Sequence, residues 1–412
     1  MRTRPWALSA IVLAACASRP PTPAPTEPAA MSDVTTSFGD DLAFLRAHVP
    51  DTLVLARGDA RVAVVPSYQG RVMTSSARGE AGASAGWVNR SLIARGEREP
   101  HMNAFGGEDR FWLGPEGGQF GLYFPPGAPF DFDHWQVPEA IDWGRWDLGA
   151  HDETRASFAR DATLVNASGT SFSVHLARTV RLLDDAEIGA LVEGRADVAA
   201  VGYASENAVT NTGASAWTRE TGLLSIWILS MYPPSPRATV VIPFRTDATG
   251  PIVHDAYFGV VPADRLHVDA ERGVLFFRAD GEHRSKIGIP PSRALPTLGS
   301  WDPVRGVLTI VHATLGAPDA PYVNSMWETQ AEPYGGDALH SYCDGPPAPG
   351  AAPLGPFYEL ESSSPAASLA PGESALHVQT TVHVEGPRAA LEVIARARFG
   401  VGLDEIEGAL AR

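Results

Sequence analysis

The 412-residue chain has only two cysteines, Cys16 and Cys343, so at most one disulfide can form and a buried core must hold the fold. Basic residues are also scarce. The chain has 32 Lys and Arg against 48 Asp and Glu, which gives a formal net charge of −16. This excess of negative charge makes nucleic acid and anionic lipid poor partners.

The sequence also lacks long apolar runs and common catalytic motifs. Beyond the N-terminus, no segment offers the roughly 20 apolar residues that a membrane-spanning helix needs. There is no P-loop, no H-E-x-x-H and no paired C-x-x-C. One G-x-S-x-G match, residues 82–86, follows small polar residues rather than a strand. We therefore interpret it as a loop and not as the nucleophile of a serine hydrolase.

The N-terminus has the pattern of an exported lipoprotein. Two arginines precede a short apolar run, residues 7–15, that is too short to span a bilayer and ends at Cys16. The letters LAAC resemble the lipobox of bacterial lipoproteins, which implies that Cys16 is lipidated. We expect a signal peptide over residues 1–16 and membrane attachment by this lipid anchor only. The alternatives are an ordinary cleaved signal peptide and translation from Met31, which would give a cytosolic protein.

A linker follows the lipobox. Residues 17–36 are rich in Pro, Ala and Thr, a composition that favours a semi-rigid extended spacer, and residues 37–412 remain as one domain. In lipoproteins the residue after the cysteine influences sorting, and Ala17 in place of aspartate implies the outer membrane. We therefore expect a cell-envelope protein, and the side of the membrane and the oligomeric state stay open.

Most of the domain has the pattern of short strands. Helical spacing occurs at residues 37–49 and 387–399. The expected strands, bounded by Gly, Pro, Asn or Asp, are residues 61–65, 121–124, 154–158, 172–183, 223–229, 238–242, 274–277, 307–312 and 375–384. Few helices and no repeat period predict an all-β antiparallel sandwich or barrel with a few short peripheral helices.

The expected strand 375–384 alternates between apolar and polar residues. Its polar face carries His377, Gln379, Thr381 and His383. The two histidines lie six residues apart, about 20 Å along a strand, which is too far to share one metal ion. We interpret this polar face as exposed to solvent.

A first candidate site lies in residues 101–118, where charged and aromatic side chains stand among glycines. Carboxylates and arginine hydrogen-bond hydroxyl groups, and tryptophan stacks on the apolar face of a sugar. The candidate residues are His101, Glu108, Asp109, Arg110 and Trp112. The alternative is a structured loop held by an Arg110–carboxylate pair.

A second candidate site contains Trp327, Asp337, His340 and Tyr342 and continues into the segment FYELESSSP. On a strand, Glu359 and Glu361 point the same way, about 7 Å apart. Two neighbouring carboxylates repel, so one can hold a raised pKa that suits general acid or base work. The alternative is an exposed strand face with solvated carboxylates.

A third hypothesis is a metal site of oxygen ligands. It would use the carboxylates of Glu108, Asp109, Glu328, Asp337 and Asp344, and such ligands favour Ca²⁺. We expect no other cofactor.

Seven specific segments cover much of the domain, at residues 70–75, 105–121, 210–229, 284–291, 322–328, 334–346 and 355–366. These segments resemble DUF6786, a bacterial family of unknown function. The order of elements is also distantly similar to the galactose-mutarotase-like superfamily, through Gly70–Arg71, Gly106–Gly107 and a late carboxylate at Glu359 or Glu361. This implies a large antiparallel β-supersandwich.

The superfamily resemblance implies a carbohydrate or polyol ligand and proton transfer at a sugar ring. The expected base is Glu359 or Glu361, and the expected acid is His340 or His101. The residues expected to bind substrate are Arg110, Trp112, Glu108, Asp109, Trp327, Asp337 and Tyr342. The sequence departs from the superfamily at its usual catalytic histidine, for which His101, His134 and His340 are the alternatives. The alternative is a non-catalytic glycan-binding or envelope-structural lipoprotein.

Overall fold

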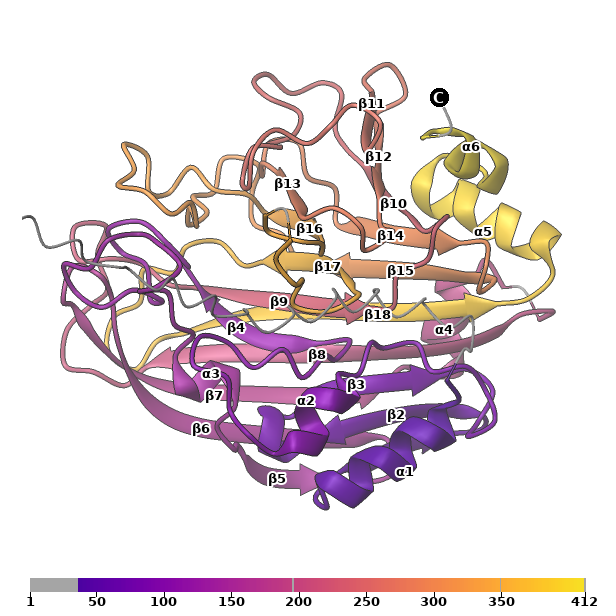
Figure 1. Cartoon of the computed structure of the whole chain (residues 1–412), viewed down its shortest axis with the longest axis horizontal. Coiled ribbons are helices and arrows are strands. Elements are labelled where there is room, and N and C mark those ends of the chain that lie inside the picture. Colours follow the sequence, from indigo (N-terminus) through magenta and orange to yellow (C-terminus); the bar gives the residue numbers. More distant parts are fainter. Residues whose placement is uncertain (1–35, 195, 349, 411–412) are drawn as a thin grey trace, which may run out of the picture. The chain divides into compact units, whose positions relative to one another are not determined.

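Three antiparallel sheets make up most of the computed structural model, which describes residues 36–410 except 195 and 349 (Figure 1). The expected signal peptide, Cys16 and the linker up to residue 35 lie outside these residues. None of the described helices is long and apolar enough to cross a membrane. The expectation of an all-β domain with a few short helices is confirmed.

The largest sheet has ten strands in the order β11-β12-β10-β14-β15-β18-β8-β7-β6-β5. From one edge to the other these are Leu266–Asp269, Val274–Arg278, Thr239–Pro243, Thr297–Asp302, Val307–Ala313, Ser374–Glu385, Ala199–Asn211, Ser171–Leu182, Arg155–Val165 and Asp147–His151. Its longest strand is β8, with 13 residues, and all 12 residues of β18 pair with it. This sheet forms one layer of the sandwich.

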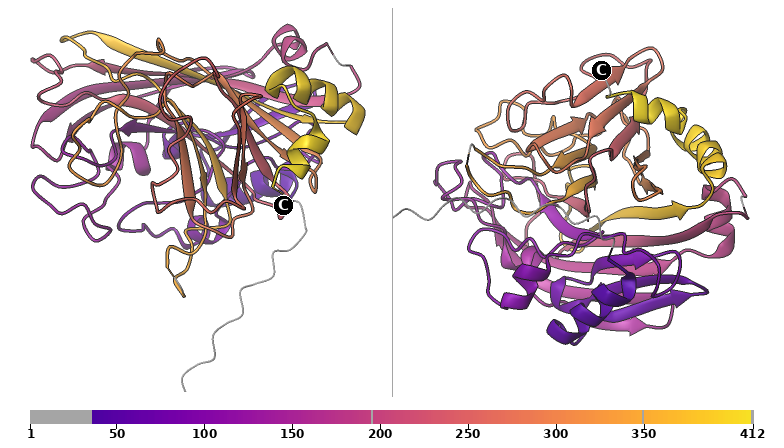
Figure 2. Two further views of the ribbon diagram at one scale, coloured as in Figure 1. Left: turned by 90° about the horizontal axis from the view of Figure 1, so that it is seen from above. Right: turned by 45° about the vertical axis from the view of Figure 1, so that its right-hand side comes forward.

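Two smaller sheets form the other layer. One has the order β1-β2-β3, with bounds Leu53–Arg57, Ala60–Val65 and Arg71–Ser76. The other has the order β13-β16-β17-β9-β4, with bounds Ser285–Ile289, Leu339–Cys343, Tyr358–Ser363, Ser225–Tyr232 and Arg110–Gly114. An antiparallel bridge between Val72 and Asp109 joins them, so β3 runs beside the start of β4. Figure 2 shows these sheets beside the large one.

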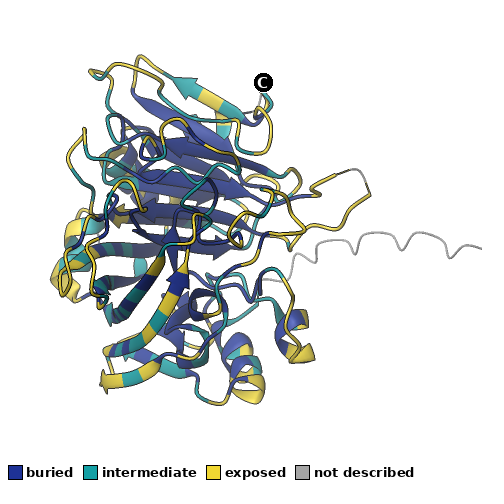
Figure 3. Cartoon of the chain, turned by 90° about the vertical axis from the view of Figure 1, so that its left-hand side faces the viewer, coloured by how far each residue is buried: buried dark blue, intermediate teal, exposed yellow. Residues whose placement is uncertain are grey.

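The helices lie outside the sheets. They are α1 (Phe38–His48), α2 (Arg90–Arg95), α3 (Glu139–Asp142), α4 (Asp185–Leu191), α5 (Arg388–Phe399), α6 (Leu403–Gly408) and a 3₁₀ turn, Pro66–Tyr68. Helices α5 and α6 cover the outer face of the large sheet, where Leu391, Ile394 and Phe399 pack against its apolar side chains. The interior strands are buried, and exposed residues gather on loops, edges and outer helix faces (Figure 3).

Local sequence signals place most of these elements. Helix α1 begins after Ser37, whose hydroxyl accepts from the N–H of Asp40, and α5 ends at Gly400 in the left-handed conformation. The prediction of a strand at residues 121–124 is wrong. Those residues form a loop, in which Tyr123 is buried and donates its hydroxyl to the carbonyl of Leu113. An apolar run can pack into a core without joining a sheet.

The interpretation of the polar face of β18 as exposed is also wrong. His377, Gln379, Thr381 and His383 are fully or nearly fully buried, whereas Leu376 on the other face is 64% exposed. The polar face points between the two layers, where His377 and Gln379 contact Ser362 of β17 and His383 contacts Glu108. Because the partners come from distant strands, the sequence of β18 alone gives no sign of them.

Candidate functional site

The outer face of the five-stranded sheet gathers most of the chemically active side chains. In antiparallel sheets, residues directly opposite each other point to the same side. The first row is Lys286, Tyr342, Glu359 and Met231, the second is His340, Glu361, Leu229 and Arg110, and the third is Ser363, Trp227 and Trp112. Five strands that are distant in sequence thus place their polar and aromatic residues side by side.

The intervening residues of these strands face the large sheet. The hydroxyl of Tyr358 contacts Ser300 of β14, and the hydroxyl of Ser362 donates to Gln379 of β18. The alternation along β17 therefore points Glu359 and Glu361 away from the interior of the sandwich.

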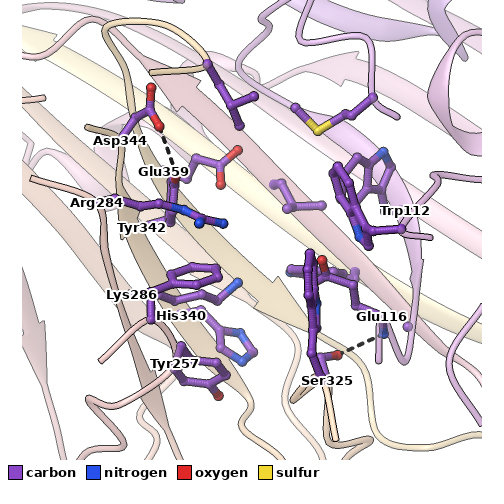
Figure 4. A pocket seen from close by; sticks show the side chains of 18 of the residues that line it. Trp112, Glu116, Tyr257, Arg284, Lys286, Ser325, His340, Tyr342, Asp344 and Glu359 are labelled. Atoms are coloured by element: carbon purple, nitrogen blue, oxygen red, sulfur yellow. Dashed lines mark hydrogen bonds between the residues drawn. The ribbon is translucent and has the colours of Figure 1, made fainter. Parts of the chain in front are cut away.

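A cavity of about 560 Å³ lies over this outer face. Its walls are rich in aromatic side chains, namely Trp112, Phe132, Trp135, Trp227, Tyr257, Phe258, Trp327, Tyr342 and Phe357. Its polar lining includes Arg110, Glu116, Arg284, Lys286, Ser325, His340, Asp344 and Glu359. Figure 4 shows Tyr257, His340 and Lys286 facing Glu116 and Ser325 across the cavity. An apolar cavity with a few convergent polar groups is the usual form of a small-molecule site.

Glu359 is the carboxylate of β17 that lines this cavity. Its Oε1 accepts a hydrogen bond of 2.7 Å from Arg110, whose guanidinium also lies 4.1 Å from the ring centroid of Trp112. Burial raises the pKa of Glu359 from 4.5 to about 8, against the opposing effect of Arg110, and the neighbouring Glu361 raises it further. The carboxyl of Glu359 therefore keeps its proton to a higher pH than a solvated glutamate does.

Glu361 has a different environment, with no solvent exposure and three neighbours around it. Its Oε2 accepts from Lys286 and from the indole N–H of Trp227, both at 2.9 Å, and lies 3.9 Å from Nδ1 of His340. The alternative of an exposed strand face with solvated carboxylates is thus wrong, because both glutamates are buried. Glu361 is positioned to hold Lys286 rather than to reach the cavity itself.

His340 lies beside Glu361 in the neighbouring strand and lines the cavity. Burial lowers its pKa well below 6.5, and the positive charges of Lys286 and His254 lower it further. The imidazole is therefore neutral at physiological pH. A neutral imidazole can accept a proton on one ring nitrogen and donate a hydrogen bond from the other.

Glu108 and Asp109 do not line the cavity, which corrects the expectation that they bind substrate there. Both lie between the layers with no solvent exposure. Glu108 contacts His383 at 2.9 Å, and Asp109 pairs with Arg178. Because side chains alternate along an extended segment, Asp109 and Arg110 point to opposite faces.

The double glycine before this segment makes the arrangement sterically feasible. Gly106 and Gly107 have φ angles of +94° and +111°, which other residues rarely adopt. A Cβ on Gly107 would lie 2.8 Å from the carbonyl oxygen of Val72. The close approach lets the start of β4 run beside β3 and so directs Arg110 to the cavity.

Two further expected site residues lie outside the cavity lining. His101 contacts the carbonyl of Trp135 and packs on Phe132, so it stands behind the wall rather than beside Glu359. Asp337 accepts from His254 and Tyr257 and is buried. It therefore holds a loop over the cavity, whereas Arg110, Trp112, Trp327, His340 and Tyr342 do line it.

The five carboxylates of the calcium hypothesis are dispersed rather than brought together. Glu108 and Asp109 lie between the layers, Asp337 binds His254, and Asp344 accepts from Tyr342 and from the N–H of Gly355. Within residues 36–410, apart from the two undescribed positions, no group of three His, Cys, Asp or Glu side chains is placed to hold a metal ion.

Several lining residues escaped the sequence analysis, including Lys286, Arg284, Trp227 and Tyr257. One signal was available for Lys286, because it is the only lysine in a chain whose other long cationic side chains are all arginine. An ammonium group is a compact point charge, and Arg and Lys are not interchangeable at a shaped site. A single lysine in such a chain is therefore worth testing for a specific role.

The chain is similar to several solved structures of low sequence identity. An Escherichia coli protein assigned as an aldose 1-epimerase shares 14% identity with a TM-score of 0.49, over 82% of this chain and 99% of the other. A galactose mutarotase-like protein from Lactobacillus casei shares 12% with a TM-score of 0.44, over 81% and 99%. A galactose mutarotase related enzyme from Lactobacillus acidophilus shares 7% with a TM-score of 0.43, over 82% and 97%.

No curated protein matches the chain in sequence. A family model does match, over residues 36–410, and the segments that suggested it lie within that range. The chain belongs to DUF6786, a family of unknown function.

Proposed function

We propose that the cavity binds a carbohydrate or related polyol and transfers protons at a sugar ring. The observation that carries this proposal is Glu359, a buried carboxyl with a pKa of about 8 at the cavity surface. A carboxyl group that keeps its proton near neutral pH can act as a general acid and, once ionised, as a base. A carboxyl in a cleft whose pKa is strongly perturbed by burial and by specific charges is a candidate functional group.

The two groups needed for anomer exchange stand on adjacent strands. Mutarotation needs an acid at the ring oxygen and a base at the anomeric hydroxyl. Glu359 and His340 are diagonal neighbours across the β16–β17 pair, roughly 7–8 Å apart at the backbone, a spacing that leaves room for a sugar ring.

The pKa directions favour protonated Glu359 as the acid and neutral His340 as the base. This is the reverse of the assignment that the superfamily resemblance implied. Glu359 would donate its proton to the ring oxygen while His340 takes the proton of the anomeric hydroxyl. The C1–O5 bond then breaks to give the open-chain aldehyde, and reclosure on the other face of the carbonyl returns both protons.

The aromatic walls suit a sugar ring. Trp112, Trp135 and Trp327 line the cavity, and the rings of Trp135 and Trp327 are stacked with centroids 5.7 Å apart. Sugars present C–H faces to aromatic rings and hydroxyl groups to charged side chains. Arg110 and Glu116 supply such charges from the same wall.

A second candidate is non-catalytic glycan binding. It is favoured by the contacts of both glutamates, since Arg110 and Lys286 each hold a carboxyl group in place in the free protein. A binding protein needs fixed charges but no proton exchange, so the two functions differ in whether anomers interconvert.

Calorimetric titration of residues 31–412 with monosaccharides and oligosaccharides tests the proposed ligand class. We expect binding by at least one sugar class and a loss of about tenfold or more in Trp112→Phe. The matched control is Trp301→Phe, because Trp301 is equally buried but packs under α6. Absence of binding by every sugar at millimolar concentration would contradict the proposal.

We further propose that the chain is lipid-anchored through Cys16 at the bacterial cell envelope, in the outer membrane. The support is the basic start, short apolar run and lipobox-like sequence ending at Cys16. Growth of an expressing cell with an alkyne fatty acid should label the full chain but not Cys16→Ser. Equal labelling of both chains would exclude this anchor.

A further inference from the structure

The edge strand of the five-stranded sheet brings two cations to the cavity. Arg284 immediately precedes β13 and Lys286 lies within it, two residues apart, and both line the cavity. Their environments differ. Lys286 contacts both oxygens of Glu361 and lies 4.6 Å from the ring centroid of Trp227. Its charge is therefore already paired.

Burial raises the pKa of the nearby Asp344 carboxyl and the charge of Arg284 opposes this, but within the described residues the two groups form no ion pair. The guanidinium of Arg284 stacks 3.8 Å from the ring centroid of Phe258 and makes no ion pair or hydrogen bond with any residue that the structure describes. The nearby carboxylate of Asp344 instead accepts 2.8 Å hydrogen bonds from the hydroxyl of Tyr342 and the N–H of Gly355. In Figure 4 the guanidinium of Arg284 points into the cavity.

We propose that Arg284 binds an anionic group, a carboxylate or a phosphate, on the sugar that enters this cavity. The inference rests on the proposed function and names its ligand class as acidic sugars. The planar guanidinium offers paired N–H donors that match the two oxygens of such a group. Stacking on Phe258 orients the plane of the guanidinium, which reduces the entropy lost on binding.

The charges of the cavity agree with an acidic ligand. The whole chain has a formal charge of −16, yet Arg110, Arg284 and Lys286 converge at this one place. Burial raises the pKa values of the lining carboxyls Glu116 and Asp344, as it does for Glu359. Because Arg110 and Lys286 already hydrogen-bond to Glu359 and Glu361, Arg284 is the cavity-lining cation whose N–H donors a ligand anion can occupy.

The test compares neutral and acidic sugars in calorimetric titrations at low salt. The probes are glucose, galactose, glucuronate, galacturonate and glucose 6-phosphate, each with the unmodified protein and with Arg284→Gln, Arg284→Lys and Arg57→Gln. Arg57 is the matched control because it is an exposed arginine of β1, far from the cavity lining. A melting curve of each variant shows that it is folded.

We expect acidic sugars to bind about 10–100-fold more tightly than their neutral counterparts, since one charged hydrogen-bonded pair has about this effect. Arg284→Gln should remove the preference and Arg284→Lys should keep part of it. Arg57→Gln should not change it, and added salt should reduce it. A preference for phosphate alone, or for uronates alone, lost in Arg284→Gln, supports the inference and identifies the anion.

Equal affinity for neutral and acidic sugars, unchanged in Arg284→Gln, would overturn the inference and leave the proposed function standing. Failure of every sugar to bind the folded protein would overturn both. A preference for acidic sugars that persists in Arg284→Gln would also overturn it, because another group would then hold the anion.

Discussion

Two pairs of buried acids stand on opposite faces of the same layer. Glu108 and Asp109 lie between the sheets and contact His383 and Arg178, whereas Glu359 and Glu361 lie under the cavity and contact Arg110 and Lys286. All four side chains are almost fully buried, and each has a cationic or ionisable partner. Burial and charge pairing therefore do not distinguish a structural pair from a candidate site.

Access to a cavity is what separates the two pairs. Neither residue of the interior pair lines the cavity over the five-stranded sheet, and fixed groups from β3, β7, β8 and β18 contact the pair. In the other pair, Glu359 keeps one side open to a space that can hold a ligand. The four predictions that follow test this difference, from the largest expected effect to the smallest.

Removing the buried ion pair of Asp109 with Arg178 should reduce the stability of the fold the most. Asp109→Ala leaves the fully buried guanidinium of Arg178 without its carboxylate, which we expect to reduce the unfolding free energy by about 3–5 kcal/mol. Urea unfolding measures this loss. The double variant Asp109→Leu with Arg178→Met should recover a large part of it, because no unpaired charge remains. A loss below about 1 kcal/mol would show that the pair is not held as described.

Replacing Glu359 should mainly change how the free energy of unfolding depends on pH. The pKa of Glu359 is raised on folding from 4.5 to about 8, so the folded state binds the proton more tightly than the unfolded state. Its contribution therefore makes stability fall as pH rises from 4.5 to 8. Glu359→Gln should reduce the difference in unfolding free energy between pH 5 and pH 8. An unchanged difference would contradict the raised pKa.

The loop over the cavity should loosen as pH rises. Hydrogen bonding to Asp337 raises the pKa of His254, against the opposing effect of burial, and this contact anchors the loop that carries Tyr257 and Phe258. The stabilisation is complete below about pH 6.5 and is lost as pH rises through the raised folded pKa. Because His254 is partly exposed, we expect less than about 1 kcal/mol.

Hydrogen exchange of residues 252–260, corrected for intrinsic rates, measures this loop opening. Protection should be greater at pH 6 than at pH 8.5, and His254→Gln should remove the difference. Equal protection at both pH values in the unmodified protein would show that this histidine does not anchor the loop.

The smallest effect is expected at the cavity rim. Phe132 is 53% exposed and packs on His101 and Trp135, so Phe132→Ala should change stability by only about 0.5 kcal/mol. Sugar binding should weaken a few-fold, because the rim loses a stacking surface. Thermal unfolding and titration measure the two effects. A large loss of stability without a change in binding would assign Phe132 to the core.

Much of the fold could be predicted from local patterns. Capping at Ser37, the proline at the start of α5 and the alternation of β18 are short-range signals, and each element forms as expected. The solvent-facing interpretation of β18 failed because burial depends on partners far away in sequence. His383 is buried since Glu108, 275 residues earlier, meets it between the layers.

The candidate site could be predicted in part. The spacing of Glu359 and Glu361 gave their common face, because a strand repeats every two residues. The partners Arg110 and Lys286 come from β4 and β13, and nothing near the glutamates in sequence indicates that these strands lie in the same sheet. The lone lysine was visible in the composition, but its place beside Glu361 required the sheet order.

The measurement that tests the central claim most directly is anomer exchange followed by two-dimensional NMR. A sugar that binds the cavity is mixed with the unmodified protein, with Glu359→Gln and with the folded control Arg57→Gln. We predict that the unmodified protein and Arg57→Gln accelerate exchange between the α and β anomers, and that Glu359→Gln lowers the rate at least 100-fold, as expected when a general acid is lost. Binding without acceleration, or equal acceleration by Glu359→Gln, would contradict acid–base chemistry at Glu359.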